Sequence, residues 1–265
     1  MVLLHGFTQN ARCWGPFSEV VGEGRLRVAV DLPGHGDSSL LRADLWQTAR
    51  AVADVCGRAD YIGYSLGARV LLHIALARSD VVERAVLIGA TAGIEDEGDS
   101  AERLDADEAL ARELDSAVGD KKAFEEFLDR WLAGPLFAGL DETMSCKEAR
   151  MGNDPAGLAS SLRSCGTGSQ RALWARVGEI AVPVLVLAGE RDERFTKLGA
   201  RLASQIGDNA HFCAVPRAGH ACHLERPAET AALVRQFFGD PLLAGEPPPL
   251  EGSAPPKVDR PPRVC

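Results

Sequence analysis

A serine between two glycines, in the pentapeptide G-Y-S-L-G, is the feature that most constrains the fold of this 265-residue chain. The apolar run 59–62 before it predicts a buried strand, and residues 68–75 after it predict a helix. Gly63 and Gly67 permit a sharp turn that few other residues allow, so we expect the Ser65 hydroxyl to stand exposed above a sheet. The pattern therefore indicates a nucleophile elbow, which needs two partner side chains.

Two candidate partners follow Ser65 along the chain, each just after a predicted strand. Residues 181–189 predict a buried parallel strand that ends before Asp192, and the strand 211–216 ends before His220. The carboxyl ends of parallel strands meet at one edge of a sheet, so both side chains are expected near the serine. An imidazole takes the serine proton, and a carboxylate fixes the tautomer of that imidazole. The chain order predicts a catalytic triad of Ser65, Asp192 and His220.

Other acids and histidines are alternatives that the sequence leaves open. Glu190 lies on the same loop as Asp192, and Glu95 and Asp96 follow a predicted strand at 84–90. Asp192 is preferred because its strand has the stronger apolar pattern. The remaining histidines lack the triad context, and we expect them to be structural, through backbone hydrogen bonds or packing. They are His5, His35, His73, His211 and His223.

Two backbone N–H groups are predicted to form an oxyanion hole. The loop His5-Gly6-Phe7 follows the apolar residues 2–4. Next to a nucleophile elbow, such a loop supplies one N–H donor and the residue after the nucleophile supplies the other, which assigns Phe7 and Leu66. Removing one such donor typically lowers the rate by roughly 100- to 1000-fold, so these amides would matter as much as the side chains.

Strands and helices alternate in the first part of the chain. The strand 26–30, the helix 43–56 and the strand 84–90 join the elbow in a βαβ rhythm. This rhythm predicts an α/β fold with a mostly parallel sheet covered by helices on both faces. The loop with His5 comes after only four residues, so strands that would precede it are expected to be missing, or the start to be assigned too late. In the former case the strand 26–30 would have an unpaired edge.

The rhythm stops after Gly93, where an acidic, alanine-rich segment of helical pattern begins. We therefore predict a core formed by residues 1–93 and 178–242, with a helical cap of residues 94–177 inserted between them. The cap would lie over Ser65 and shape the substrate pocket. The proline-rich residues 243–265 contain too few apolar side chains to fold, and we expect a disordered tail.

Composition excludes several classes of function. The net charge is −9 and no basic stripe is present, which argues against a nucleic-acid partner. No segment approaches the ~18 apolar residues of a membrane span, and no signal-peptide pattern begins the chain, so a cytoplasmic protein is expected. The seven cysteines lack C-x-x-C spacing and clusters with histidine, which indicates neither a disulfide framework nor a metal site. The oligomeric state stays open.

Six segments carry a resemblance to a known family: LHGF at 4–7, DLPGHGDS at 31–38, GYSLGAR at 63–69, W131 with PLF at 135–137, GERD at 189–192 with F195, and RAGH at 217–220. They resemble the α/β-hydrolase superfamily and, more narrowly, the 2-succinyl-6-hydroxy-2,4-cyclohexadiene-1-carboxylate synthases of menaquinone biosynthesis. The resemblance covers roughly residues 2–240. It implies the α/β-hydrolase fold and a lyase that needs no cofactor.

That family removes pyruvate from 2-succinyl-5-enolpyruvyl-6-hydroxy-3-cyclohexene-1-carboxylate, a polycarboxylate. The resemblance implies that the triad abstracts a ring proton, with no acyl-enzyme. It also implies substrate contacts from Tyr64, Arg69, Arg103, Trp131 and Arg150. Arg69 is expected near the elbow on geometric grounds as well, because it lies one helical turn beyond the serine. Arginine suits carboxylates because its planar fork binds them through two hydrogen bonds.

Two other functions remain open at the level of sequence. A hydrolase of esters or carbon–carbon bonds would use the same triad through an acyl-enzyme. A binding protein on the same scaffold would have no catalytic role, and the intact triad argues against it.

Overall fold

The computed structural model describes residues 1–239, and these form one six-stranded sheet in the order β2-β1-β3-β4-β5-β6. Every pair of neighbouring strands is parallel. The strands are β1 (Val2–Leu4), β2 (Val28–Val30), β3 (Ala59–Tyr64), β4 (Val82–Ile88), β5 (Val184–Gly189) and β6 (Ala210–Val215). Parallel pairing brings all their carboxyl ends to the same edge.

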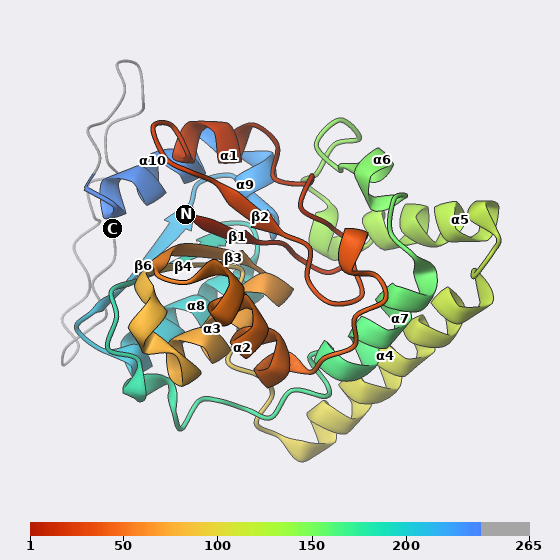
Figure 1. The fold of residues 1–265 in the computed structure, drawn as a ribbon, viewed down its shortest axis with the longest axis horizontal. Coiled ribbons are helices and arrows are strands. Elements are labelled where there is room, and N and C mark those ends of the chain that lie inside the picture. Colours follow the sequence, from red (N-terminus) through yellow and green to blue (C-terminus); the bar gives the residue numbers. More distant parts are fainter. Residues whose placement is uncertain (240–265) are drawn as a thin grey trace.

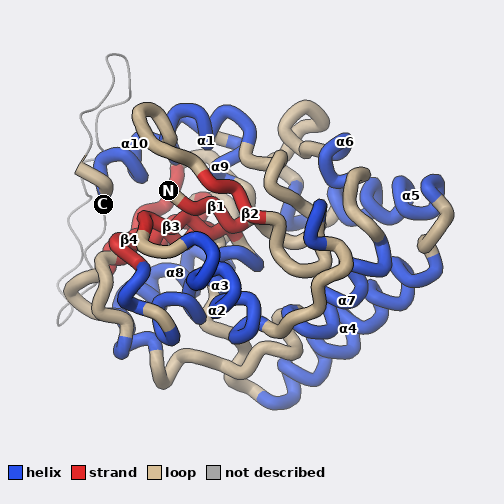
Figure 2. The backbone as a smooth tube through the Cα atoms, in the orientation of Figure 1, coloured by secondary structure: helices blue, strands red, loops and turns tan. Residues whose placement is uncertain are grey.

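Helices cover both faces of the sheet, as Figures 1 and 2 show. One face packs against α2 (Leu45–Cys56), α3 (Leu66–Ala77) and α8 (Glu193–Ile206). The other face packs against α1 (Gly15–Val21), α9 (Cys222–Glu225) and α10 (Pro227–Phe237). This arrangement confirms the predicted α/β class.

Strand β5 is apolar along its whole length because both of its faces are buried. In β5, Val184 and Val186 belong to the cluster under α3 and α8, while Leu185 and Leu187 belong to the cluster under α1 and α10. Side chains alternate between the faces of a strand, so each face receives every second apolar residue. The predicted helix 43–56 begins at Leu45, because Asp44 and Gln47 form a reciprocal capping box.

Four helices lie between β4 and β5 in sequence and to one side of the sheet in Figure 1. They are α4 (Glu97–Ser116), α5 (Lys121–Leu132), α6 (Lys147–Arg150) and α7 (Pro155–Cys165). Helices α4, α5 and α7 share a small apolar cluster that includes Leu114, Phe127 and Leu158. The boundaries of the predicted cap, 94–177, stay a prediction. The predicted tail, 243–265, lies outside the described residues.

Shorter 3-10 turns occur at Gly36–Ser38, Ser79–Val81, Pro135–Phe137 and Val177–Glu179. Strand β2 forms one edge of the sheet, and within residues 1–239 it pairs with β1 alone. Val28 is accordingly 39% exposed. Among the described helices, none has the length and apolar character needed to cross a bilayer.

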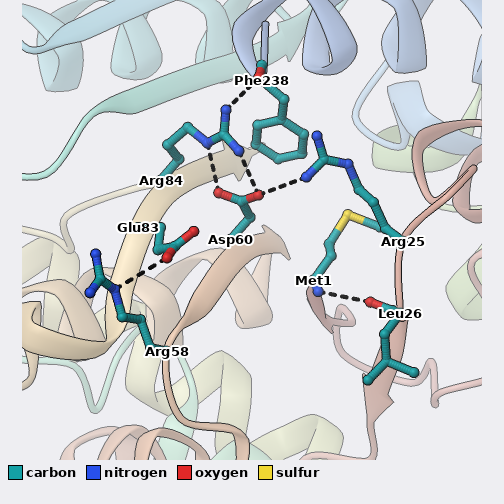
Figure 3. Close-up of polar contacts among 8 residues, drawn as sticks. All are labelled: Met1, Arg25, Leu26, Arg58, Asp60, Glu83, Arg84 and Phe238. Carbon is teal, nitrogen blue, oxygen red and sulfur yellow. Dashed lines mark hydrogen bonds and ion pairs between the residues drawn. The ribbon is translucent and has the colours of Figure 1, made fainter. Parts of the chain in front are cut away.

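Figure 3 shows an ion-pair cluster around Asp60. Asp60 lies at the start of β3, whereas the elbow follows the end of that strand. The buried carboxylate of Asp60, at the start of β3, accepts hydrogen bonds from Arg84 Nε at 2.7 Å and from Arg25 Nη1 at 3.1 Å. The guanidinium groups of both arginines also lie over the ring of Phe238. These contacts tie β3, β4 and the loop before β2 to Phe238, the residue that follows α10.

Candidate active site

Ser65 lies on a strained turn between β3 and α3. Its backbone has φ 51° and ψ −105°, in a region that non-glycine residues rarely occupy. A side chain on Gly63 would clash with the backbone of Gly67, and one on Gly67 would clash with the carbonyl oxygen of Leu4. The two glycines therefore allow the sharp turn that the sequence predicted, and the structure adds that they let the turn pack tightly against β1.

The structure brings the three predicted triad residues together. His220 Nε2 lies 3.3 Å from Ser65 Oγ, and His220 Nδ1 lies 2.8 Å from Asp192 Oδ2. In the tautomer with its proton on Nδ1, the imidazole donates to Asp192 and accepts the serine hydroxyl proton on Nε2. The His220 side chain is only 4% exposed, so bulk water does not compete strongly for these bonds.

Asp192 is held by its position at the N-terminus of α8. Its Oδ1 accepts a hydrogen bond from the Phe195 N–H at 3.1 Å, which leaves Oδ2 for the histidine. The Phe195 ring packs against the imidazole of His220, with 4.4 Å between ring centres. One carboxylate thus caps a helix and orients the histidine at the same time.

The three acids that the sequence offered as alternatives to Asp192 are hydrogen-bonded to groups other than His220. Glu190 accepts a hydrogen bond from the Arg217 N–H at 2.9 Å, and Glu95 pairs with Arg201 at 2.6 Å. Asp96 caps α4 through the Asp99 N–H. Each of these three carboxylates has a local structural partner, and only Asp192 reaches the imidazole.

Glu225 supports the histidine loop and was missed by sequence analysis. Its buried carboxylate accepts hydrogen bonds from the N–H groups of Gly219 at 2.7 Å and Ala221 at 3.2 Å, on either side of His220. The acid comes five residues after the histidine, a spacing that is not by itself a recognisable signal.

The two predicted oxyanion donors lie on the wall of the same pocket as Ser65. Phe7 and Leu66 both line it, and within the described residues neither backbone N–H donates to a protein acceptor. The Gly67 N–H donates to the His5 carbonyl at 3.0 Å, which fixes the elbow relative to the loop that carries Phe7.

The other histidines are not hydrogen-bonded to Ser65 or Asp192 in the described residues. His5 Nε2 accepts a hydrogen bond from the Leu32 N–H at 3.1 Å, and burial lowers the pKa of His5 to about 4. Burial likewise lowers the pKa of His35 to about 3, of His73 to about 4 and of His223 to about 3. These four imidazoles are therefore neutral at pH 7, while His211 lies partly exposed on β6.

The pocket above Ser65 is rich in arginine and has no acidic wall residue among the described residues. Besides the serine, the histidine and the oxyanion donors, it is lined by Tyr64, Thr91, Trp131, Leu136, Phe137, Ser161, Leu162, Cys165, Gly166, Thr167 and Phe195. Four arginines complete the lining, namely Arg69, Arg103, Arg150 and Arg194. The pocket lining is therefore positively charged, although the net charge of the whole chain is −9.

Arg150 is fully buried and has no carboxylate partner in the described part of the chain. Its Nε donates to the Ser145 carbonyl at 2.7 Å, and its Nη1 donates to the Thr8 hydroxyl and to the Phe7 carbonyl at 3.4 Å. Its Nη2 is buried and has no acceptor. Burial lowers the pKa of Arg150, and a nearby anion would offset that cost.

Arg69 is the second buried cation of the pocket, and it too lacks a carboxylate partner within residues 1–239. Its Nη1 donates to Gln170 Oε1 at 3.1 Å and to the Gly166 carbonyl at 3.4 Å, both neutral acceptors. Burial lowers the pKa of Arg69 to about 10, so the side chain remains charged at pH 7.

Arg103 differs from the two buried arginines because it already has an acid partner. Its Nε lies 2.7 Å from Asp107 Oδ1 within α4. Arg194 was not singled out from the sequence, although it comes two residues after the predicted acid and lines the pocket. Its guanidinium lies over the Phe195 ring, 5.9 Å from the ring centre.

Trp131 and Tyr64, both singled out from the sequence, line the pocket as well. The Trp131 ring packs edge to face against Phe7, with 5.4 Å between ring centres, and its buried Nε1–H has no acceptor among residues 1–239. Tyr64 is buried and burial raises its pKa, so its hydroxyl stays protonated. No cluster of three or more His, Cys, Asp or Glu side chains suited to a metal ion occurs in residues 1–239.

Comparisons with known proteins identify the family to which the chain belongs. Residues 1–233 match the Alpha/beta hydrolase family. The 2-succinyl-6-hydroxy-2,4-cyclohexadiene-1-carboxylate synthase of Serratia proteamaculans (strain 568) is 29% identical over 252 residues, or 91% of this chain and 93% of that protein. A protein of Bacillus subtilis (strain 168) that carries the same name provisionally is 34% identical over 252 residues, or 90% of this chain and 89% of its own length.

Solved structures extend the comparison to the fold. The structure of MenH from S. aureus matches with a TM-score of 0.81 and 29% sequence identity, covering 90% of this chain and 92% of that one. The enol-lactonase from Burkholderia xenovorans LB400 matches with a TM-score of 0.74 over 90% of both chains, but at 21% identity this likeness concerns the fold alone.

Proposed function

Because the chain belongs to the α/β-hydrolase family, we propose a specific activity for it within that family. The proposed enzyme is a carbon–oxygen lyase that removes pyruvate from 2-succinyl-5-enolpyruvyl-6-hydroxy-3-cyclohexene-1-carboxylate. The product is 2-succinyl-6-hydroxy-2,4-cyclohexadiene-1-carboxylate. The names of the relatives at about 30% identity support this choice of reaction.

The observation that carries the proposal is the uncompensated positive charge in the pocket. Two buried guanidinium groups, those of Arg69 and Arg150, face neutral partners in the described structure. A buried cation without an anion is costly, and a substrate with several carboxylates would supply the missing charge. A neutral ester would bring no negative charge to offset these two buried cations.

In the proposed mechanism Ser65 acts as the base. Its hydroxyl proton passes to His220 Nε2, and the serine oxygen removes the ring proton next to the succinyl carbonyl. The electron pair of that C–H bond forms a double bond between ring carbons 2 and 3, and the electron pair of the existing double bond between carbons 3 and 4 moves to carbons 4 and 5. The bond from the ring to the enolpyruvyl oxygen breaks, and pyruvate leaves as its enolate, which takes the proton from the imidazolium.

The remaining site residues have roles in the same proposal. The N–H groups of Phe7 and Leu66 stabilise the negative charge that develops on the conjugated carbonyl oxygen. Arg69, Arg103 and Arg150 hold the carboxylates. Trp131 and Tyr64 shape the pocket, and residues 94–177 close over it as a cap.

The alternative is a hydrolase in which Ser65 attacks a carbonyl carbon and forms an acyl-enzyme. The distance of 3.3 Å between Ser65 Oγ and His220 Nε2 suits both reactions, so chemistry has to separate them. Rapid covalent labelling of Ser65 by a fluorophosphonate, together with fast ester cleavage, would favour the hydrolase.

The experiment is a pyruvate-release assay with the purified protein, coupled to lactate dehydrogenase. Wild type and Ser65→Ala are compared on the enolpyruvyl cyclohexene substrate and on p-nitrophenyl acetate. Fast release of pyruvate that depends on Ser65, with slow ester cleavage, is the expected result. Ester cleavage without pyruvate release would contradict the proposed lyase.

A further inference from the structure

Gln170 contacts Arg69 but does not itself line the pocket above Ser65. Its side chain is 4% exposed, and its Oε1 accepts the hydrogen bond from Arg69 Nη1 at 3.1 Å. Its Nε2 is buried and has no acceptor in the described residues. Within residues 1–239 the amide therefore contributes only its oxygen to the polar network, and that oxygen accepts a hydrogen bond from Arg69 alone.

A carboxylate in the same place would make a stronger bond to the guanidinium. Glutamate differs from glutamine only in the replacement of the amide NH₂ by an oxygen, and charge-assisted hydrogen bonds are roughly twice as strong as neutral ones. A glutamate would, however, neutralise the cation. The amide retains the orienting hydrogen bond and leaves the positive charge available to an anion in the pocket.

The positive charge of Arg69 is also not neutralised by Asp107, because other groups bind that carboxylate. The carboxylate of Asp107, whose charge acts on Arg69, is engaged by Arg103 Nε at 2.7 Å and by the Gly168 N–H at 3.1 Å. The other acceptor of Arg69 is the Gly166 carbonyl, which is also neutral. The loop 166–170 thus presents only uncharged oxygens to the guanidinium.

We propose that Gln170 is a positioning residue that determines specificity, since it orients Arg69 through a neutral acceptor and thereby keeps the cation free to bind a substrate carboxylate. The inference rests on the proposed role of Arg69 as a carboxylate ligand. It assigns the selectivity for anionic substrates partly to a residue that does not touch the substrate.

The test compares Gln170→Glu with Gln170→Met. Gln170→Glu retains a hydrogen-bond acceptor for Arg69 but neutralises the charge of Arg69 by pairing it with a carboxylate. Gln170→Met leaves Arg69 charged but removes its acceptor. Gln205→Glu is the matched control, because Gln205 is exposed on α8 outside the pocket lining and the net charge changes by the same amount. Thermal unfolding of each variant shows whether it is folded.

The expected result is a rise of at least about 10-fold in KM for the enolpyruvyl cyclohexene substrate in Gln170→Glu, with a smaller change in kcat. Gln170→Met is expected to raise KM less than Gln170→Glu, and Gln205→Glu to leave it unchanged. A Gln170→Glu variant with the KM of wild type would overturn the proposal. So would a Gln170→Met variant whose KM rises as much as that of Gln170→Glu, since the role would then be structural.

A binding measurement separates this proposal from the proposed reaction. Succinate, a simple dicarboxylate, is titrated into wild type, Gln170→Glu and Gln170→Met by calorimetry. Weaker succinate binding in Gln170→Glu than in Gln170→Met supports the role of Gln170 even if wild type releases no pyruvate. Equal binding by the three proteins would overturn that role even if wild type proves to be the lyase.

Discussion

The guanidinium of Arg150 is hydrogen-bonded to the side-chain hydroxyl of Thr8, on the loop that carries the oxyanion donor Phe7. The same nitrogen, Nη1, lies 3.4 Å from the Phe7 carbonyl. A proposed substrate cation on α6 and a proposed oxyanion donor of the core therefore share one polar network. A shift of the Arg150 guanidinium will therefore change the position of the Phe7 backbone, and the reverse also holds.

This network predicts the effect of Arg150→Lys. The lysine keeps the charge but cannot bond at once to the Ser145 carbonyl, the Phe7 carbonyl and the Thr8 hydroxyl. We expect kcat/KM for pyruvate release to fall by about 100-fold or more. Arg112→Lys, an exposed change on α4, is the matched control. If Arg150→Lys and Arg112→Lys had similar kinetics, the role assigned to the planar guanidinium of Arg150 would be wrong.

Asp192→Asn tests the assignment of the acid. An asparagine can donate its amide hydrogen to His220 Nδ1, which favours the tautomer whose Nε2 cannot accept the serine proton. We expect kcat to fall by roughly 1000- to 10,000-fold in the pyruvate-release assay. Glu95→Gln should change kcat by less than about twofold, because that acid pairs with Arg201 on the surface. The reverse ranking would show that the acid was assigned wrongly.

Gly67→Ala tests the packing of the elbow against β1. The added methyl group would clash with the backbone carbonyl of Leu4, which cannot move without disturbing the sheet. We expect a loss of at least about 3 kcal/mol in the free energy of unfolding, measured by urea denaturation. In the control Gly178→Ala the new Cβ would lie no closer than 3.4 Å to another atom, so little change is expected. Equal stability of both variants would refute the close approach.

The buried histidines predict that stability falls in mild acid. The pKa of His223 in the folded protein is lowered to about 3, so the unfolded chain binds a proton near pH 6.5 and the folded protein does not. Its contribution is present above pH 6.5 and is lost as the pH falls towards 3, at about 1.4 kcal/mol per pH unit.

His223→Phe removes this titration and keeps a ring among Trp14, Phe17 and Tyr64. Urea unfolding at pH 5.0 and pH 7.5 should show a smaller loss of stability for the variant than for wild type. Parallel losses in the two proteins would mean that His223 does not control the acid sensitivity.

The sequence predicted the elbow and the order of the triad because those signals are local. Gly63 and Gly67 flank the serine within five residues, and each triad partner directly follows an apolar strand. The sheet was predictable for a related reason, since strands buried on both faces are apolar at every position. The ends of elements were predicted less well. The strand expected at 26–30 is β2, Val28–Val30, and the strand expected at 84–90 is β4, Val82–Ile88.

Partners that lie far apart in the sequence were beyond prediction. Nothing near Gln170 indicates that its amide oxygen binds Arg69, and Glu225 has no motif that marks it as the support of the histidine loop. Arg194 lay beside the predicted acid, but a lone arginine in a helix is usually a surface charge.

The sequence by itself determined the α/β class, the serine on its turn and the residues that could act with it, because short-range patterns of apolar side chains and glycine encode them. Only the tertiary structure decided the charge of the pocket. Arg69 and Arg150 are remote in sequence, and whether a buried guanidinium faces a carboxylate or a neutral oxygen depends on which distant segments pack against it. That choice sets the electrostatic energy of the site, and it becomes visible only once the chain is folded.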